Sequence, residues 1–264
     1  MKFTKMHGLG NDYLYVYSNE EPKNAPELSV KLSERHFGAG SDGMIWILPS
    51  YKADFKMRIF NADGSEAKMC GNGIRCVGKY VFDKGYTDKT ELEIETLSGI
   101  KTLSLKTENG KVSSVSVGMG RAEVSADKGI SVCGKTVLCT PVSMGNPHAV
   151  IFTEDADNAP LTTLGAAIEK HETFPGGVNV EFVTVISDTE LRMRVWERGS
   201  GITMACGTGA CASAAAAVSK GFCKPDEDIA VKLDGGTLHI KISKNADVTM
   251  NGPAEFIYEG ETME

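Results

Sequence analysis

The chain lacks the features by which membrane-spanning, secreted and zinc-binding proteins are commonly recognised. No apolar run approaches the roughly 18 residues that a membrane-spanning helix requires. The segment Met1–Lys5 carries charge but no apolar signal core, so we expect a soluble protein of the cytoplasm with no membrane partner. There is no Cys-x-x-Cys pair, and neither Cys70/Cys76 nor Cys206/Cys211 has the spacing of a zinc site, so we expect no metal.

Charge and composition further narrow the class of protein and its possible partners. The 264 residues carry a net charge of −7 with acidic and basic residues interspersed, so we expect no nucleic-acid partner. The seven cysteines are an odd number, which favours free thiols over a disulfide framework. Many glycine-containing turns separate short alternating segments, which is typical of a β-rich protein with few helices.

A cysteine at the beginning of a predicted helix is the most informative local feature. Cys206 is followed by Gly207-Thr208-Gly209 and then by the alanine-rich segment 212–218, whose residues favour a helix. The first turn of a helix has free N–H groups and the positive end of the helix dipole. We therefore expect the pKa of the Cys206 thiol to lie below the value of roughly 8.5 for a free cysteine. The same N–H groups can bind a ligand carboxylate.

The Cys-Gly-x-Gly segment occurs twice, and other short motifs are repeated with it in the same order. Offsets of 132–137 residues separate the two copies, which chance does not readily explain. The paired segments are Gly10-Asn11 and Gly145-Asn146, Gly40–Asp42 and Gly177–Asn179, Cys70 and Cys206, Lys84-Gly85 and Lys220-Gly221, Leu97–Gly99 and Leu233–Gly235, and Gly120–Glu123 and Gly252–Glu255.

This repeat predicts an α+β (α/β-like) fold of two pseudo-repeated lobes, residues 1–122 and 123–264. Each lobe is expected to be a β-rich, barrel-like sheet around a central helix, with one catalytic cysteine per lobe and the active site in the cleft between them. The tail after Glu255 is expected to add a strand to one of the lobes.

Two facing lobes would place Cys70 and Cys206 on opposite sides of a small ligand. Inverting an sp³ carbon requires one group that removes a proton and another that delivers a proton to the opposite face, and a thiolate with a thiol can do both. The helix starts would hold the carboxylate on which charge develops. Neither Cys-Gly-x-Gly segment has the spacing of a Walker or Rossmann loop, so we expect no nucleotide and no pyridoxal phosphate.

The other cysteines have a simpler interpretation. A lone cysteine is more often a small buried apolar residue than a reactive one, and we assign that role to Cys76, Cys133, Cys139, Cys211 and Cys223. The duplicated context of Cys70 and Cys206 favours function instead.

Short polar residues in the predicted loops are candidate ligand contacts, although an asparagine in a turn is commonly present for its backbone tolerance. Arg198 beside Glu197 is either a surface ion pair or a bidentate partner for an amino-acid carboxylate. His148 is either a structural histidine or, with Glu197, a group that tunes the thiol pKa values. The candidates are Asn11, Asn61, Asn72, Asn146, Asn179, Glu197, Arg198 and Thr208.

Taken together, the motifs resemble those of the diaminopimelate epimerase family over nearly the whole chain. They are Lys5–Asp12, Asn61–Ser65, Met69–Gly73, Gly145–His148, Gly177–Asn179, Glu197–Gly199 and Ala205–Gly209. The resemblance implies a cofactor-independent isomerase that interconverts LL- and meso-2,6-diaminopimelate on the route to lysine and peptidoglycan. It also implies two similar α/β lobes with the site between them, and commonly a homodimer.

Carried over residue by residue, the resemblance implies that Cys70 and Cys206 are the catalytic proton donor and acceptor, with roles that swap in the reverse direction. His148 and Glu197 match positions that modulate the cysteines. The implied substrate contacts are Asn11, Asn61, Gly71, Asn72, Asn146, Asn179, Glu197, Arg198, Gly207 and Thr208.

One position departs from the family pattern. Many members carry a substrate-contacting glutamine where this chain has Gly43, so that contact is absent or supplied otherwise. Proline and hydroxyproline racemases share the two-thiol design but commonly have histidine where this chain has Asn72. Two alternatives stay open: a racemase of the same fold acting on another amino acid, such as histidine, and a non-catalytic amino-acid binder or thiol redox sensor.

Overall fold

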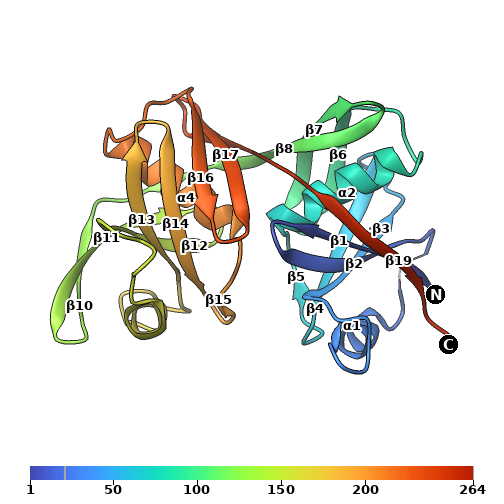
Figure 1. The fold of residues 1–264 in the computed structure, drawn as a ribbon, viewed down its shortest axis with the longest axis horizontal. Coiled ribbons are helices and arrows are strands. Elements are labelled where there is room, and N and C mark those ends of the chain that lie inside the picture. Colours follow the sequence, from blue (N-terminus) through green and yellow to red (C-terminus); the bar gives the residue numbers. More distant parts are fainter. Residues whose placement is uncertain (21, 264) are drawn as a thin grey trace. The chain divides into compact units, whose positions relative to one another are not determined.

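The chain folds into two compact units (Figure 1). The computed structural model describes residues 1–20 and 22–263. The first unit contains Met1–Val117 and the residues from Gly252 onward, and the second contains Gly118–Asn251. This division differs from the predicted ranges, because the last strand, β19 (Glu255–Glu261), pairs antiparallel with β1 (Lys2–Gly8). The expected extra strand therefore exists, and it belongs to the first unit.

The first unit is a curved sheet around one helix. The ladder order is β19–β1–β2–β3–β4–β6–β7–β8, with β2–β3 and β4–β6 parallel and the other pairs antiparallel. Its remaining elements are β2 (Asn11–Tyr17), α1 (Ala25–Ser33), β3 (Gly43–Leu48), β4 (Phe55–Asn61), β5 (Glu66–Ala67), α2 (Gly71–Asp83), β6 (Glu91–Thr96), β7 (Gly99–Glu108) and β8 (Lys111–Arg121).

The second unit has the same plan. The order is β11–β12–β13–β14–β16–β17–β18, with β12–β13 and β14–β16 parallel and the other pairs antiparallel. Its elements are β9 (Glu123–Val124), β10 (Lys128–Val132), β11 (Lys135–Ser143), β12 (Pro147–Phe152), the π-helical turn η1 (Leu161–Gly165), α3 (Ala166–Glu169), β13 (Asn179–Ser187), β14 (Glu190–Glu197), β15 (Gly201–Ile202), α4 (Gly207–Ser219), β16 (Asp228–Leu233), β17 (Gly236–Ile242) and β18 (Asp247–Gly252).

The predicted internal repeat is confirmed at the level of topology. Each strand from β1 to β8, apart from the short β5, has a counterpart from β11 to β18 that pairs in the same order and the same direction. Even the short strands correspond, because β5 pairs with β4 as β15 pairs with β14. The enclosed helices α2 and α4 follow β5 and β15.

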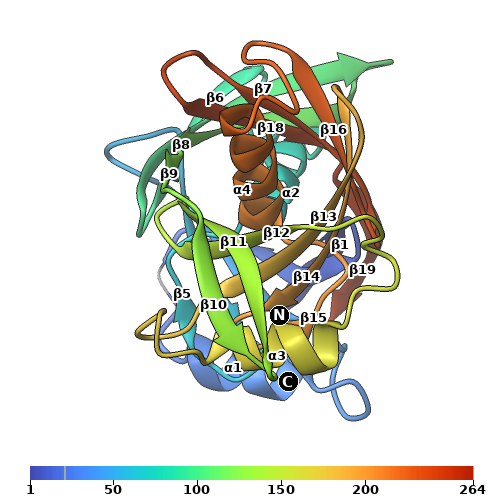
Figure 2. The same ribbon diagram turned by 90° about the vertical axis from the view of Figure 1, so that its left-hand side faces the viewer.

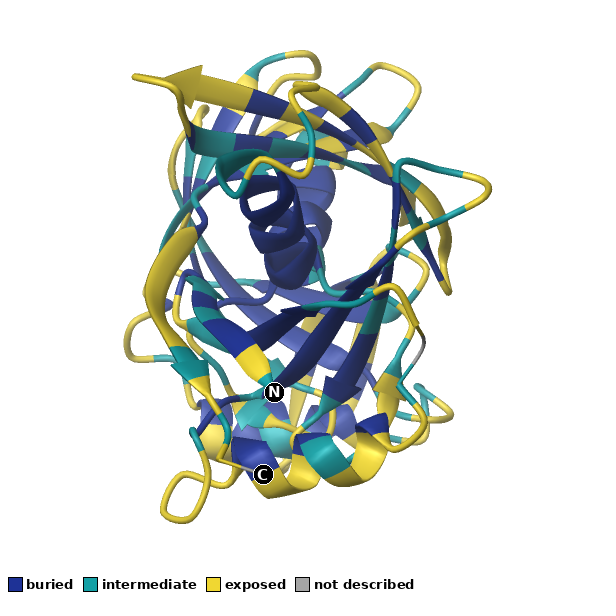
Figure 3. Cartoon of the chain, turned by 90° about the vertical axis from the view of Figure 1, so that its right-hand side faces the viewer, coloured by how far each residue is buried: buried dark blue, intermediate teal, exposed yellow. Residues whose placement is uncertain are grey.

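Each enclosed helix is buried along most of its length. The residues of α2 are buried from Gly71 to Val81, and Figure 3 shows this helix in the buried colour inside the sheet. The alanines of α4 are all buried, and Figure 2 shows α4 surrounded by strands of the second unit. A helix that is apolar all round is a core helix rather than a surface helix, so the alanine run fits its position. Small side chains also let the strands approach the helix closely.

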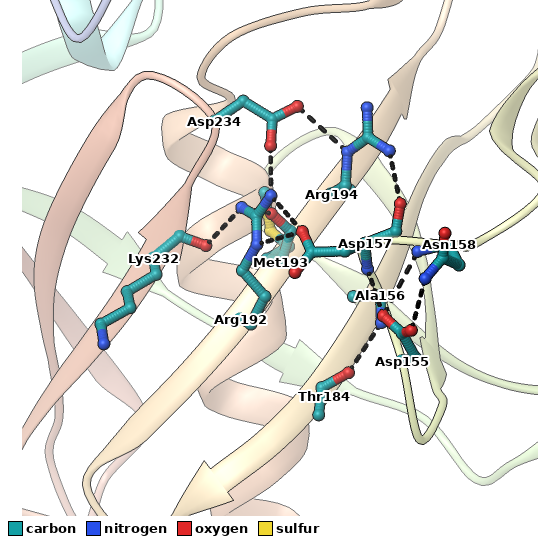
Figure 4. Close-up of polar contacts among 10 residues, drawn as sticks. All are labelled: Asp155, Ala156, Asp157, Asn158, Thr184, Arg192, Met193, Arg194, Lys232 and Asp234. Carbon is teal, nitrogen blue, oxygen red and sulfur yellow. Dashed lines mark hydrogen bonds and ion pairs between the residues drawn. The ribbon is translucent and has the colours of Figure 1, made fainter.

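An ion-pair network on the outside of the second unit fixes the middle of β14 (Figure 4). Arg192 Nε donates to Asp157 Oδ1 at 2.9 Å, and its guanidinium also pairs with Asp234. Arg194 donates to Asp234 Oδ2 at 3.1 Å and to the carbonyl of Asp157. Burial alone would raise the pKa of Asp234, but the hydrogen bonds from the two arginines outweigh it and lower the pKa.

No helix in the described part of the chain combines the length and the apolar character that crossing a bilayer requires.

Candidate active site

Both duplicated cysteines are N-cap residues. Cys70 caps α2, and its Sγ accepts the N–H of Gly73 at 3.3 Å. Cys206 caps α4, and its Sγ accepts the N–H of Gly209 at 3.3 Å. Each cysteine has an extended backbone, as serine or threonine has in the same capping role. The predicted helix starts are therefore confirmed, and each sulfur is held against the first turn of its helix.

Two predicted site residues, Asn11 and Asn72, meet around Cys70. The Oδ1 atom of Asn11 accepts from Cys70 Sγ at 3.4 Å and from Asn72 Nδ2 at 3.4 Å. Cys70 is half-buried and Asn72 is buried. Strand β2 thus supplies a polar side chain that contacts both the cysteine and the second helical residue.

Two further residues of this cluster were not predicted. Asp42 Oδ2 accepts from Asn11 Nδ2 at 2.8 Å, which orients that amide, and burial raises the pKa of this carboxyl. Tyr13 is buried, and burial followed by the charges of Cys70 and Asp42 raises the pKa of its phenol above the ordinary value. Because side chains alternate along β2, Asn11 and Tyr13 lie on the same face of the strand. This pattern could have identified Tyr13 as a neighbour of the site from the sequence.

Asn61 lies at the end of β4, opposite Gly43 in the register of β3 and β4. Its Nδ2 donates to Ser65 Oγ at 3.0 Å. A Cβ atom on Gly43, whose φ is +154°, would lie 2.2 Å from the carbonyl oxygen of Phe60. A side chain at position 43 would therefore displace the backbone that carries Asn61, so glycine suits the strand pairing here.

A corresponding cluster surrounds Cys206, which is buried. Thr208 Oγ1 lies 3.7 Å from Cys206 Sγ and accepts from Asn146 Nδ2 at 3.3 Å. Nε2 of His148 lies 3.1 Å from Asn146 Oδ1. Asn11 with Asn72 and Asn146 with Thr208 occupy equivalent places, so both units join the beginning of the second strand to the first turn of the enclosed helix.

The electrostatics of Cys206 contradict the expected acidic thiol. Burial, followed by the charges of Glu197 and Glu181, raises the pKa of Cys206, and the donors at Thr208 and Gly209 oppose this only in part. Burial also raises the pKa of Glu197. The hydrogen bond that the hydroxyl of Thr203 donates to this carboxylate offsets only part of that rise. The prediction of a lowered pKa is wrong for Cys206, because desolvation and two carboxylates outweigh the helix start.

The side chain of Asn179 is hydrogen-bonded to the backbone of Arg198. Asn179 lies opposite His148 in the register of β12 and β13, and its Oδ1 accepts the N–H of Arg198 at 3.0 Å. The Nη1 atom of the exposed Arg198 donates to the carbonyl of Gly176 at 3.2 Å. Glu169, which was not predicted, accepts from the N–H of Gly199 at 2.9 Å and so fixes the turn that carries the arginine.

Glu181 is a further residue that was not predicted. Its Oε1 atom lies 2.7 Å from Nδ1 of His148, and neither side chain is exposed. A usable signal was present, because Glu181 stands between Val180 and Phe182 in an apolar strand. A charged residue inside a buried strand requires a partner.

Comparison with known proteins agrees with these features. A family model described as diaminopimelate epimerase matches residues 3–125 and 140–257. The diaminopimelate epimerase of Acetivibrio thermocellus is 52% identical to this chain over 276 residues, which cover 99% of this chain and 98% of the relative. Two solved structures share the fold at low identity. A probable proline racemase from Agrobacterium radiobacter K84 has a TM-score of 0.75 at 17% identity, covering 99% of this chain and 92% of that chain. A PhzF-family phenazine biosynthesis protein from Bacillus anthracis has a TM-score of 0.76 at 15% identity, covering 100% and 99%.

Proposed function

The chain belongs to the diaminopimelate epimerase family, and we propose that it interconverts LL- and meso-2,6-diaminopimelate with two cysteine thiols and no cofactor. The observation that carries the mechanism is the duplicated N-cap cysteine. In each unit a sulfur is held by the third N–H of a buried helix and lies beside a polar side chain, that of Asn11 at Cys70 and that of Thr208 at Cys206.

The proposed reaction moves one proton in and one proton out. The thiolate of Cys206 removes the proton from Cα, and the electron pair of that C–H bond moves into the adjoining carboxylate. The thiol of Cys70 then delivers a proton to the opposite face of Cα. In the reverse direction the two cysteines exchange roles. This mechanism requires the two units to present both sulfurs to one substrate, and that requirement is part of the proposal.

The helix starts are the proposed electrostatic catalysts. The first N–H groups of a helix have no partner inside the helix, so those of α2 and α4 can bind the carboxylate on which negative charge develops. The proposed substrate contacts are Asn11, Asn61, Gly71, Asn72, Asn146, Asn179, Glu197, Arg198, Gly207 and Thr208.

We assign His148 and Glu197 to the control of Cys206. The charge of Glu197 raises the pKa of the thiol, so the empty site favours a protonated sulfur. A substrate ammonium group near this carboxylate would offset its charge and lower the pKa of the thiol as substrate binds.

Location and assembly belong to the same proposal. The thiols must stay reduced, and each of the seven cysteines is free, which supports a cytoplasmic enzyme.

Exposed apolar side chains on β19, those of Phe256, Ile257 and Tyr258, support a homodimer. Light scattering at two protein concentrations measures the assembly state.

The test is exchange of the Cα proton of diaminopimelate for deuterium in D₂O. We expect exchange with the wild-type protein, and none with Cys70→Ala or Cys206→Ala. Cys133→Ala is the matched control, because Cys133, for which the expected burial is wrong, is exposed and lies outside both clusters. Full exchange in both cysteine variants would exclude the two-thiol mechanism.

A panel of amino acids separates the alternatives. Preference for a mono-amino acid such as histidine would replace diaminopimelate with another substrate. Absence of any isomerisation by fully reduced protein would favour a binder or a redox sensor.

A further inference from the structure

Glu181 is a fully buried carboxylate with one partnered and one unpartnered oxygen. Its Oε1 atom lies 2.7 Å from Nδ1 of His148, and both side chains have no exposed surface. Among the residues that the structure describes, Oε2 has no hydrogen-bond partner. Burying a carboxylate costs desolvation free energy, which its partners must offset. Packing alone would favour an apolar residue in this strand.

The carboxylate stands at the end of a chain of contacts that reaches the thiol. His148 Nε2 lies 3.1 Å from Asn146 Oδ1, and Asn146 Nδ2 donates to Thr208 Oγ1 at 3.3 Å. Thr208 Oγ1 in turn lies 3.7 Å from Cys206 Sγ. Glu181 is therefore linked to Cys206 through three side chains, each within hydrogen-bonding reach of the next.

The carboxylate fixes the donor at its own end of this chain of contacts. An ionised carboxylate only accepts, so Nδ1 of His148 donates its proton to Glu181. The Oδ1 atom of Asn146 faces Nε2 of the ring, and the amide nitrogen of Asn146 donates to Thr208. The amide of Asn146 is thus oriented by the imidazole, and the imidazole is oriented by Glu181.

The backbone beside Cys206 also rests against this carboxylate. A Cβ atom on Gly209 would lie 2.8 Å from Glu181 Oε1 and 3.2 Å from Cys206 Sγ. The N–H of the same glycine donates to the sulfur. The beginning of α4, the sulfur and Glu181 therefore pack together, and movement of one displaces the others.

We propose that Glu181 is a positioning residue that holds His148, Asn146 and Thr208 in place around the thiol of Cys206. The inference rests on the proposed epimerase function and extends it, because Glu181 touches no substrate and acts through the imidazole. The charge of Glu181 is among the causes that raise the pKa of Cys206, so the carboxylate also affects the thiol directly.

The experiment compares Glu181→Leu, which removes the acceptor, with Glu181→Gln, which keeps a hydrogen-bonding amide of the same size. Two quantities are measured: kcat/KM for deuterium exchange into diaminopimelate, and the ¹⁵N signals of the His148 ring, assigned with His148→Gln. We expect Glu181→Leu to lower kcat/KM by about 10²-fold, as misplacement of site groups does, and Glu181→Gln to restore part of it. The proton on Nδ1 of His148 should be lost in Glu181→Leu and kept in Glu181→Gln, whose amide oxygen can accept it.

A matched control exists on the surface of the same unit. His239 Nδ1 lies 2.7 Å from Asp228 Oδ2, the same distance, but both side chains are exposed. Asp228→Asn should change neither kcat/KM nor the His148 signals.

The outcomes separate the two proposals. Wild-type kcat/KM in Glu181→Leu, or unchanged His148 ring signals in that variant, would overturn the role of Glu181 while leaving the epimerase intact. If Glu181→Leu does not fold, Glu181→Met, which also removes the acceptor, takes its place, and unchanged ring signals in that variant would overturn the role equally. Absence of exchange with the wild-type protein would overturn the epimerase function and this inference together.

Discussion

The thiol of Cys206 lies between opposing influences at the scale of a single residue. The N–H of Gly209 stabilises the thiolate, whereas burial and the carboxylates of Glu197 and Glu181 destabilise it more strongly. A sulfur of this kind resists adventitious oxidation and alkylation when the site is empty, because the thiolate is the reactive form.

Replacing Glu197 tests this balance. Glu197→Gln removes a negative charge that raises the pKa of Cys206, so the thiol should ionise at lower pH than in the wild type. The rate of alkylation by iodoacetamide, followed at Cys206 by peptide mass mapping between about pH 7 and 10, should reach its midpoint at lower pH. Glu190→Gln, on the same strand but paired with Lys232, should leave the profile unchanged. A shift of the midpoint to higher pH would contradict the assignment.

At the scale of the element, each enclosed helix begins with a cysteine that serves as both a cap and a reactant. The sulfur accepts the N–H of the third helical residue in α2 and in α4. The two roles can be separated, because a serine oxygen caps a helix at least as well as a sulfur but is a far weaker acid.

Cys206→Ser should therefore preserve the fold and lose the reaction. We expect the free energy of unfolding in urea to change by less than about 1 kcal/mol. Deuterium exchange should fall by at least about 10²-fold, because the hydroxyl cannot act as the base. Cys206→Ala, which loses the cap as well, should be less stable than the serine variant. Equal stability of the two variants would show that the cap contributes nothing.

Sequence patterns could predict these elements because local chemistry determines them. The Cys-Gly-x-Gly segments and the alanine run indicate both helix starts, and alternation indicates β4 and β6. The contacts of Glu181 could not be predicted, because its partner His148 lies on a neighbouring strand and is brought near only by parallel pairing. The strand β19 itself was expected, but its partner could not be predicted for the same reason, because β1 is at the other end of the chain.

At the scale of the whole molecule, the first unit is built from the two ends of the chain and the second from its middle. Strand β19 pairs along nearly all of β1, and the N-terminal ammonium of Met1 donates to Thr262 Oγ1 at 2.8 Å. Arg75 of α2 also donates to the carbonyl of Pro253 at 3.1 Å. The last residues therefore stabilise the first unit and its helix.

Ending the chain after Asn251 should affect the two units unequally. Amides of β1 lose their β19 partners and should exchange with solvent much faster, whereas amides of β12 and β13 should keep their protection. Hydrogen–deuterium exchange with peptide mass spectrometry measures both. A chain that ends after Glu261 keeps β19 and is the matched control. Equal loss of protection in both units would contradict this division.

The discontinuous first unit has a consequence for synthesis on the ribosome. When β18 has left the exit tunnel, the second unit has all of its residues, whereas the first still lacks the strand that covers the edge of β1. Domains commonly mature from the N-terminus onward as translation proceeds, but here the middle of the polypeptide is complete first. A nascent protein stalled before residue 255 therefore retains an open sheet edge at β1.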